Sequence, residues 1–242
     1  GGGRLLPVVV ACLTPEKSAL TRDGLRTWLK ETLFENKPDR LIIDAFPGGI
    51  FGELCELHEL DSIECIYLAR ILQLEKYLQR TGQYRLPKIS SIFEIERLKP
   101  EHQAFNAQLC SQISKIELLD PPAQVVEPIA RQLPAEFSLI IHSGPVSEVE
   151  DLCRYALETS EIRGCETPFV VVSSGERPSS CLPSALHFNL WPAGRLITRA
   201  NSVFSGAGCN IIRQMRGSQK PHFAIPFARA LDDQFFRLAS CR

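Results

Sequence analysis

Short apolar runs alternate with longer amphipathic segments along the chain, which is typical of α/β proteins with parallel strands. In the first half, Leu25, Leu29 and Leu33 recur every four residues and predict a helix over residues 18–37. A second helix is expected near residues 52–60. Runs that predict strands lie at residues 5–13, 40–46, 63–72 and 113–120, and the segment before the last run mixes helical pieces with loops.

The second half of the chain alternates more regularly and predicts an open parallel sheet of about five strands. The predicted strands lie at residues 137–144, 167–175, 185–192, 201–208 and 221–228, and the helices at 146–161, 195–200, 209–217 and 232–240. Between the halves, four prolines within residues 120–136 disfavour a continuous element. We therefore expect an N-terminal domain over residues 1–125 and a C-terminal domain over residues 126–242.

The most informative stretch of the second half is SVFSGAGCNIIRQM, residues 202–215. It predicts a short strand, a turn of Gly206, Ala207 and Gly208, and the start of a helix. A helix N-terminus exposes unpaired N–H groups and partial positive charge, so small residues there let a phosphate approach the backbone. Glycine turns of this kind also serve packing alone, and both explanations stay open.

Acidic side chains at two other places have a similar double interpretation. Asp44 ends the run RLIID and precedes a Pro-Gly-Gly turn, where its carboxylate either caps the turn or points toward a ligand. Asp232 and Asp233 open the last predicted helix, where they either cap the helix and favour its dipole or bind a ligand.

The tail of the chain resembles the nucleotide-sugar-binding half of GT-B-fold glycosyltransferases. The likeness rests on ANSVFSGAGCNIIRQM and on KPHFAIPFARALDDQFFRLA. It is nearest to the branch of the bacterial lipid-linked GlcNAc transferase of peptidoglycan synthesis and to related predicted glycosyltransferases. A weaker likeness begins at Asp39 and includes Asp44 and the strand YLARIL with Arg70. The resemblance implies two Rossmann-like domains whose parallel sheets face across a cleft, with the first domain abbreviated.

The resemblance also implies roles for individual residues. The turn would bind the diphosphate of the donor through backbone amides, and no metal or other cofactor is expected, because amides and helix dipole neutralise that charge. On the acceptor side, Asp44 and Arg70 would contact the acceptor, and Asp44 is the candidate catalytic base. The implied donor-binding residues are Ser143, Gly144, Leu190, Trp191, Gly206, Ala207, Gly208, Cys209, Asn210, Gln214, Asp232, Asp233 and Gln234.

Several features depart from that family. Gln214 stands where the family has a Glu that accepts hydrogen bonds from the ribose, so this contact should be weaker without charge assistance. Cys209 lies inside the turn, either as a small buried residue or as a thiol activated by the helix N-terminus. The usual base in a first glycine-rich loop has no counterpart, although His142 ends a strand beside Ser143. The chain also looks shortened at both ends.

Composition narrows the expected partners and location. The net charge is −1, from 27 basic and 28 acidic residues, which gives no reason to expect nucleic acid or an anionic membrane surface. No apolar run approaches the length of a membrane-spanning helix. Nine cysteines without CxxC spacing indicate reduced thiols in a cytoplasmic protein. Because Met215 is the one methionine, Gly1 is not expected to be a translation start.

These observations favour a glycosyltransferase that moves a sugar from a nucleotide-sugar donor, expected to be UDP-linked, to an unknown acceptor. One alternative is a non-catalytic relative that binds a nucleotide sugar, or a subunit whose partner supplies the missing parts. Gln214 and the absent first loop favour that alternative. Another is a hydrolase or epimerase of nucleotide sugars, because a fold does not fix a reaction. A peripheral membrane or protein partner is not evident in the sequence.

Overall fold

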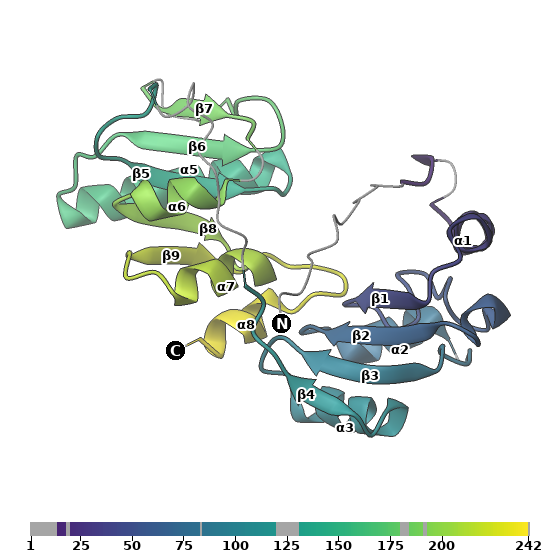
Figure 1. The fold of residues 1–242 in the computed structure, drawn as a ribbon. Helices are drawn as coiled ribbons and strands as arrows, with labels where there is room; N and C mark the ends of the chain where they lie inside the picture. Colours follow the sequence, from purple (N-terminus) through teal and green to yellow (C-terminus); the bar gives the residue numbers. More distant parts are fainter. Residues whose placement is uncertain are drawn as a thin grey trace, which may run out of the picture. The chain divides into compact units, whose positions relative to one another are not determined.

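The computed structural model describes residues 14–17, 20–82, 84–119, 131–179, 184–190 and 193–241. The chain divides into two compact units, each with its own sheet (Figure 1). Unit 1 contains Gly1–Arg70, Leu74–Glu94 and Leu98–Lys115, and unit 2 contains Ile71–Gln73, Ile95–Arg97 and Ile116–Arg242. The strand predicted at residues 5–13 and the boundary predicted at residue 125 lie outside the described residues.

Unit 1 is built on a parallel sheet in the order β1-β2-β3-β4. Its strands are β1 (Arg40–Asp44), β2 (Glu64–Ala69), β3 (Ile89–Glu94) and β4 (Ile113–Lys115), and its helices are α1 (Arg22–Asn36), α2 (Leu74–Thr81) and α3 (Pro100–Leu109). The helix predicted over residues 18–37 is α1, in which Leu25 and Leu33 are buried and Thr21 caps the first turn.

The helix predicted near residues 52–60 is wrong. That segment forms turns and one short 3₁₀ helix, η2 (His58–Leu60). The Glu53 carboxylate accepts hydrogen bonds from the amides of Ile50 and Phe51, which fixes a turn at the place where the helix was expected to begin. Gly52 and Glu56 have φ values of 80° and 55°, in the left-handed region that a right-handed helix excludes.

Unit 2 is built on a parallel sheet in the order β7-β6-β5-β8-β9. Its strands are β5 (Ser138–His142), β6 (Phe169–Ser173), β7 (Leu186–Phe188), β8 (Ser202–Gly206) and β9 (His222–Ile225). Its helices are α5 (Val146–Arg163), α6 (Gly194–Arg199), α7 (Cys209–Arg216) and α8 (Gln234–Ala239). The first three strands are added in one direction and the last two in the other, so the chain order reverses between β5 and β8.

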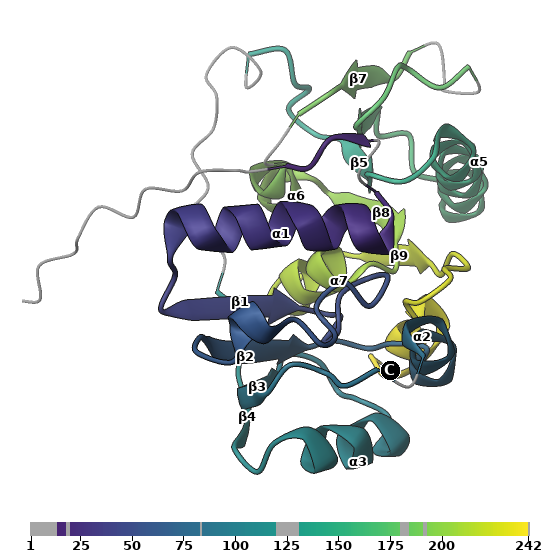
Figure 2. The same ribbon diagram turned by 90° about the vertical axis from the view of Figure 1, so that its right-hand side faces the viewer.

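Both faces of this second sheet are covered by helices, as Figures 1 and 2 show for α5 and α6. Alternate strand residues point to opposite faces, and two separate cores result. Leu139, Val170 and Val203 pack with residues of α6 and α7, whereas their neighbours Ile140, Val171 and Phe204 pack with α5. The predicted α/β fold class with parallel sheets is confirmed.

A buried polar contact in unit 1 supports the backbone that follows β1. Tyr67 donates a hydrogen bond to the carbonyl oxygen of Ala45 at 3.1 Å, and its hydroxyl lies 3.3 Å from Nε2 of His102. Ala45 has φ of 66°, a conformation that costs about 1 kcal/mol or more in a non-glycine residue. His102 is only 1% exposed, and burial lowers its pKa to about 4.

We expect His102 to make the stability of the protein depend on pH. Its ordinary pKa is about 6.5, so between about pH 6.5 and about pH 4 the unfolded chain binds a proton that the folded chain does not. The stability due to the neutral ring is complete above about pH 6.5 and is lost as the pH falls toward 4. Urea unfolding measures the free energy of unfolding at each pH. As the pH falls through this range, that free energy should decrease by about 3 kcal/mol less in His102→Gln than in the wild type.

Burial also lowers the pKa of His222, in unit 2, to about 4, so both proteins should keep the pH dependence that His222 contributes. An equal loss of stability in wild type and His102→Gln would contradict the prediction.

Candidate functional site

The carboxyl ends of β5 and β8 are the expected ligand site of unit 2, because ligands of open parallel sheets bind where the strand order reverses. β5 ends at His142 and continues into Ser143 and Gly144. β8 ends at Gly206 and leads through the glycine turn into α7. The structure therefore brings the two predicted small-residue segments, 143–144 and 206–210, to the same point of the sheet.

The turn between β8 and α7 is held by the protein's own hydrogen bonds. The buried Ala207 donates from its amide to the carbonyl oxygen of Ile225 at 2.9 Å and accepts from Arg237 Nη1 at 3.1 Å. The Ala207 amide is thus already used. The amides of Gly208, Cys209 and Asn210, at the start of α7, have no acceptor inside the helix. They are the groups that an anion could reach.

The glycines around the turn differ in whether the structure requires a glycine at their positions. A Cβ atom at Gly206 would lie 2.7 Å from Cε1 of His142, and one at Gly144 would collide with Nε2 of the same ring. Both glycines are therefore required by packing against His142. At Gly208, φ is −70° and the nearest atom to a Cβ would be Cγ2 of Ile211 at 4.0 Å. Neither backbone conformation nor packing requires glycine at position 208.

His142 is held by an acidic and a basic partner. Its Nε2 lies 2.6 Å from Oε2 of Glu148, in the first turn of α5, and Arg229 donates to both carboxylate oxygens of Glu148. The ring of Phe227 packs on the imidazole with centroids 5.1 Å apart. Hydrogen bonds from Arg229, and then from His142, hold the pKa of the Glu148 carboxyl below its usual value. Sequence reasoning missed Glu148 and Arg229, since no local spacing connects residues 81 positions apart.

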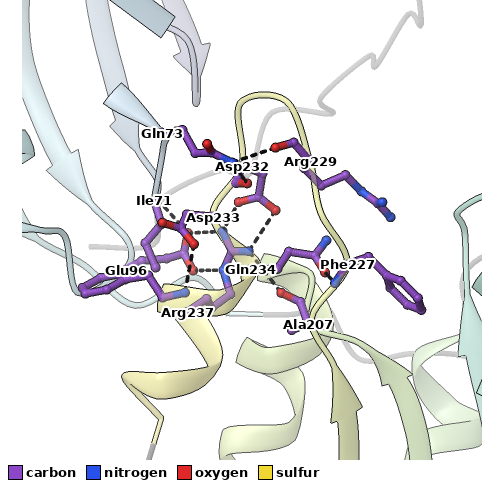
Figure 3. Close-up of polar contacts among 11 residues, drawn as sticks. Ile71, Gln73, Glu96, Ala207, Phe227, Arg229, Asp232, Asp233, Gln234 and Arg237 are labelled. Atoms are coloured by element: carbon purple, nitrogen blue, oxygen red, sulfur yellow. Dashed lines mark hydrogen bonds and ion pairs between the residues drawn. The ribbon is translucent and has the colours of Figure 1, made fainter. Parts of the chain in front are cut away.

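A second buried ionic network lies behind the turn (Figure 3). Arg237 is 1% exposed and uses all five of its N–H donors: three reach Asp232 and Ala207, and two reach Glu96. Burial alone would raise the pKa of Glu96, but the hydrogen bonds and charge of Arg237 lower it. Burial likewise opposes the charge of Arg237, yet the two carboxylates raise its pKa above the ordinary value.

The predicted donor-binding group at residues 232–234 makes contacts within unit 2. Asp232 forms an ion pair with Arg237 at 2.6 Å, and Asp233 caps α8 by accepting from the amide of Phe236 at 2.9 Å. Gln234 is 5% exposed, and its Oε1 accepts from the amide of Phe227 at 3.0 Å. Capping thus accounts for Asp233. Contact of this group with a donor stays a prediction.

The remaining predicted donor residues lie around the same turn or outside the described residues. The thiol of Cys209 is hydrogen-bonded to the Glu96 carboxylate, which helps to lower the pKa of that carboxyl. Gln214 lies on α7 one turn beyond Asn210, on the same side of the helix. Leu190 packs against the core beside β6 and α6. Trp191 lies outside the described residues.

In unit 1, the structure brings the predicted acceptor-side residues Asp44 and Arg70 into contact. Arg70 Nη2 lies 2.8 Å from Oδ2 of Asp44, and the Asp44 side chain is 50% exposed. Asp44 ends β1 and Arg70 directly follows β2. These adjacent parallel strands end at the same edge of the sheet, which brings the two side chains together. The loop after Asp44 is anchored by Tyr77, which accepts from the amide of Gly48 at 2.7 Å and donates to the carbonyl oxygen of Gly49 at 3.2 Å.

Across the described residues, no group of three or more His, Cys, Asp or Glu side chains is placed to hold a metal ion. Within the same ranges, no helix combines the length and the apolar character that crossing a bilayer requires.

Known proteins resemble this chain in fold and not in sequence. No protein-family model and no curated protein matches the sequence. Among solved structures, the glycosyltransferase SnogD from Streptomyces nogalater matches 92% of this chain with a TM-score of 0.54 and 13% sequence identity. This chain spans 62% of the length of that SnogD chain. At such low identity the likeness shows the fold alone, an α/β fold with Rossmann-like parallel sheets, as the sequence predicted.

We expect substitutions of the two turn glycines to affect stability differently. Gly206→Ala should lower the free energy of unfolding by about 1–3 kcal/mol, because the ring of His142 or Phe227 must move to admit the new methyl group. Gly208→Ser should change it by less than about 1 kcal/mol, since serine fits there and is a good N-cap. Urea unfolding of the two variants measures the difference, and equal losses would contradict the assignment.

Proposed function

We propose that this chain is a glycosyltransferase of GT-B-like architecture. It binds a nucleotide sugar, expected to be UDP-linked, in unit 2 and passes the sugar to an acceptor that contacts Asp44 and Arg70. The observation that carries the proposal is the position of the glycine turn. The turn lies where the strand order reverses, leads into the N-terminus of α7, and is open at Gly208, where packing does not require glycine. The fold likeness to SnogD, itself a glycosyltransferase, supports the proposal.

The proposed donor site neutralises a diphosphate without a metal. The amides of Gly208, Cys209 and Asn210 donate to phosphate oxygens, and the dipole of α7 adds partial positive charge. Because Ala207 is fixed by β9 and Arg237, these amides keep their direction before the donor arrives. One turn further along α7, Gln214 hydrogen-bonds the ribose without the charge of a carboxylate. The nucleobase meets the backbone near Leu190.

The proposed acceptor side depends on Asp44. An inverting transfer needs a base to take the proton of the acceptor hydroxyl, and Asp44 is the carboxylate at the end of β1 with an exposed side chain. Its ion pair with Arg70 engages that carboxylate and specifically favours a second candidate function. That candidate is a relative that binds the nucleotide sugar in unit 2 and does not turn it over.

Thermal unfolding with nucleotides tests the donor site. A ligand that binds only the folded protein stabilises it by mass action, by about 2.7 kcal/mol at 100 times its Kd. We expect one of UDP, GDP, CDP and dTDP to raise the melting temperature of the wild type. Gly208→Asp places a carboxylate over the α7 amides, so it should abolish this rise while capping α7 as well as glycine does.

The matched control is Gly217→Asp, at the other end of α7, where a Cβ atom meets nothing within 4 Å. It adds the same charge to the same helix and should keep the nucleotide response. No response of the wild type to any nucleotide, or an unchanged response in Gly208→Asp, would contradict the proposed donor site.

Donor turnover separates the enzyme from the non-catalytic relative. We expect the purified protein to consume one nucleotide sugar slowly, and Asp44→Asn to lower that rate by about 100-fold or more through loss of the base. The nucleotide-dependent rise in melting temperature should persist in this variant. Asp61→Asn, another exposed aspartate of unit 1, serves as the control. Mass spectrometry of the products distinguishes transfer, hydrolysis and epimerisation, and a wild type without turnover would favour the binding-only candidate.

A further inference from the structure

His142 occupies the point where the strand order of unit 2 reverses. It is the last residue of β5, and its ring lies against the glycines that follow β5 and end β8. The side chain is 9% exposed. Nε2 is bonded to Glu148, whereas Nδ1 lies 2.9 Å from the Cβ position of Gly206 and has no protein partner among the described residues. One polar atom of this ring therefore lies beside Gly206, where the turn begins, and forms no hydrogen bond with the described residues.

The surroundings of this ring are built to hold it in one orientation. Arg229 fixes the Glu148 carboxylate through both oxygens, and that carboxylate fixes Nε2. Gly144 and Gly206 leave the space that the ring fills, and Phe227 covers one of its faces. An apolar side chain would fill this space without the cost of partly desolvating the Glu148 carboxylate. The polar arrangement thus indicates a role for the remaining nitrogen.

The chemistry of Nδ1 suits an anion. A carboxylate only accepts hydrogen bonds, so Nε2 donates to Glu148. When the ring carries both protons, Nδ1 becomes a second donor on the opposite side. The charges of Arg229, Glu148 and the doubly protonated ring then sum to one positive charge. A phosphate oxygen beside the turn would meet a charge-assisted donor that is already oriented.

We propose that His142 contacts the diphosphate of the donor directly, through Nδ1, in addition to the amides of α7. This inference rests on the proposed function, because it assigns a further binding residue to the same donor site. It also explains why both flanking glycines make room for an imidazole.

Two substitutions separate the role of Nδ1 from a structural role. In His142→Gln the amide nitrogen can keep the hydrogen bond to Glu148, while the Nδ1 position is left without a polar atom. In His142→Asn the amide occupies the Nδ1 position, while the bond to Glu148 is lost. His187→Gln replaces another histidine of unit 2, which lies on β7 and is bonded to Ser173, and it serves as the control.

Calorimetry with UDP, GDP, CDP, dTDP and inorganic pyrophosphate measures the effect. We expect His142→Gln to weaken binding of the nucleoside diphosphate and of pyrophosphate by about ten- to hundredfold. His142→Asn should bind more tightly than His142→Gln, and His187→Gln should bind as the wild type does. Nitrogen-15 spectra of the wild type, with the His142 ring signals assigned by through-bond correlation to the sequentially assigned backbone, should show Nδ1 shifting when pyrophosphate is added.

The outcomes distinguish this inference from the proposed function. If the wild type binds none of these ligands, the proposed function fails and this inference fails with it. If the wild type binds and His142→Gln keeps its affinity, or both His142 variants lose it equally, His142 is not a contact while the donor site stands. If the His142 variants do not fold, an Nδ1 signal of the wild type that ignores pyrophosphate overturns the inference by itself.

Discussion

The guanidinium of Arg237 is the constraint on which the candidate site depends. It is buried, and it meets two carboxylates and one backbone carbonyl with every N–H it has. Removing one partner from such a network typically costs about 3–5 kcal/mol, because a buried charge is left uncompensated. The network joins the start of α8, through Asp232, to Glu96 and to the glycine turn at Ala207 (Figure 3). The turn therefore has its shape without a ligand.

In this arrangement, side chains that looked alike in the sequence have different roles. Asp232 and Asp233 serve the protein's own structure, one as the counter-ion of Arg237 and one as the cap of α8. Gly206 serves packing, whereas Gly208 stays open to the surroundings. A site whose charges are satisfied internally needs little reorganisation when an anion arrives, which is the condition under which fixed amides bind well. The buried network thus fixes the position of the amides at the N-terminus of α7.

Much of the fold could be predicted because it depends on local patterns of apolar and small residues in the sequence. Alternating apolar runs indicated the parallel sheets, and the glycine turn indicated where β8 meets α7. The failures are of two kinds. Near residues 52–60 an amphipathic pattern suggested a helix, but the Glu53 carboxylate and the positive φ of Gly52 fix turns instead. Arg229 pairs with Glu148 over 81 residues and Arg237 pairs with Glu96 over 141 residues, and a single sequence carries no signal at those separations.

The proposed donor site in unit 2 and the proposed acceptor side in unit 1 are stabilised by different interactions. In unit 2, the buried ion pair of Arg237 with Glu96 fixes the turn, and the partly exposed ion pair of Glu148 with Arg229 fixes the imidazole, so charge is oriented before a ligand binds. In unit 1, Tyr67 stabilises the positive φ of Ala45, and thereby the backbone directly after Asp44. The Asp44 side chain is half exposed, so its ion pair with Arg70 is accessible to solvent. Ion pairs of this kind contribute about 1 kcal/mol or less to the free energy of unfolding. Arg70 could therefore exchange Asp44 for an acceptor at little cost, so the same ion pair that favours a binding-only protein is weak enough to permit an enzyme.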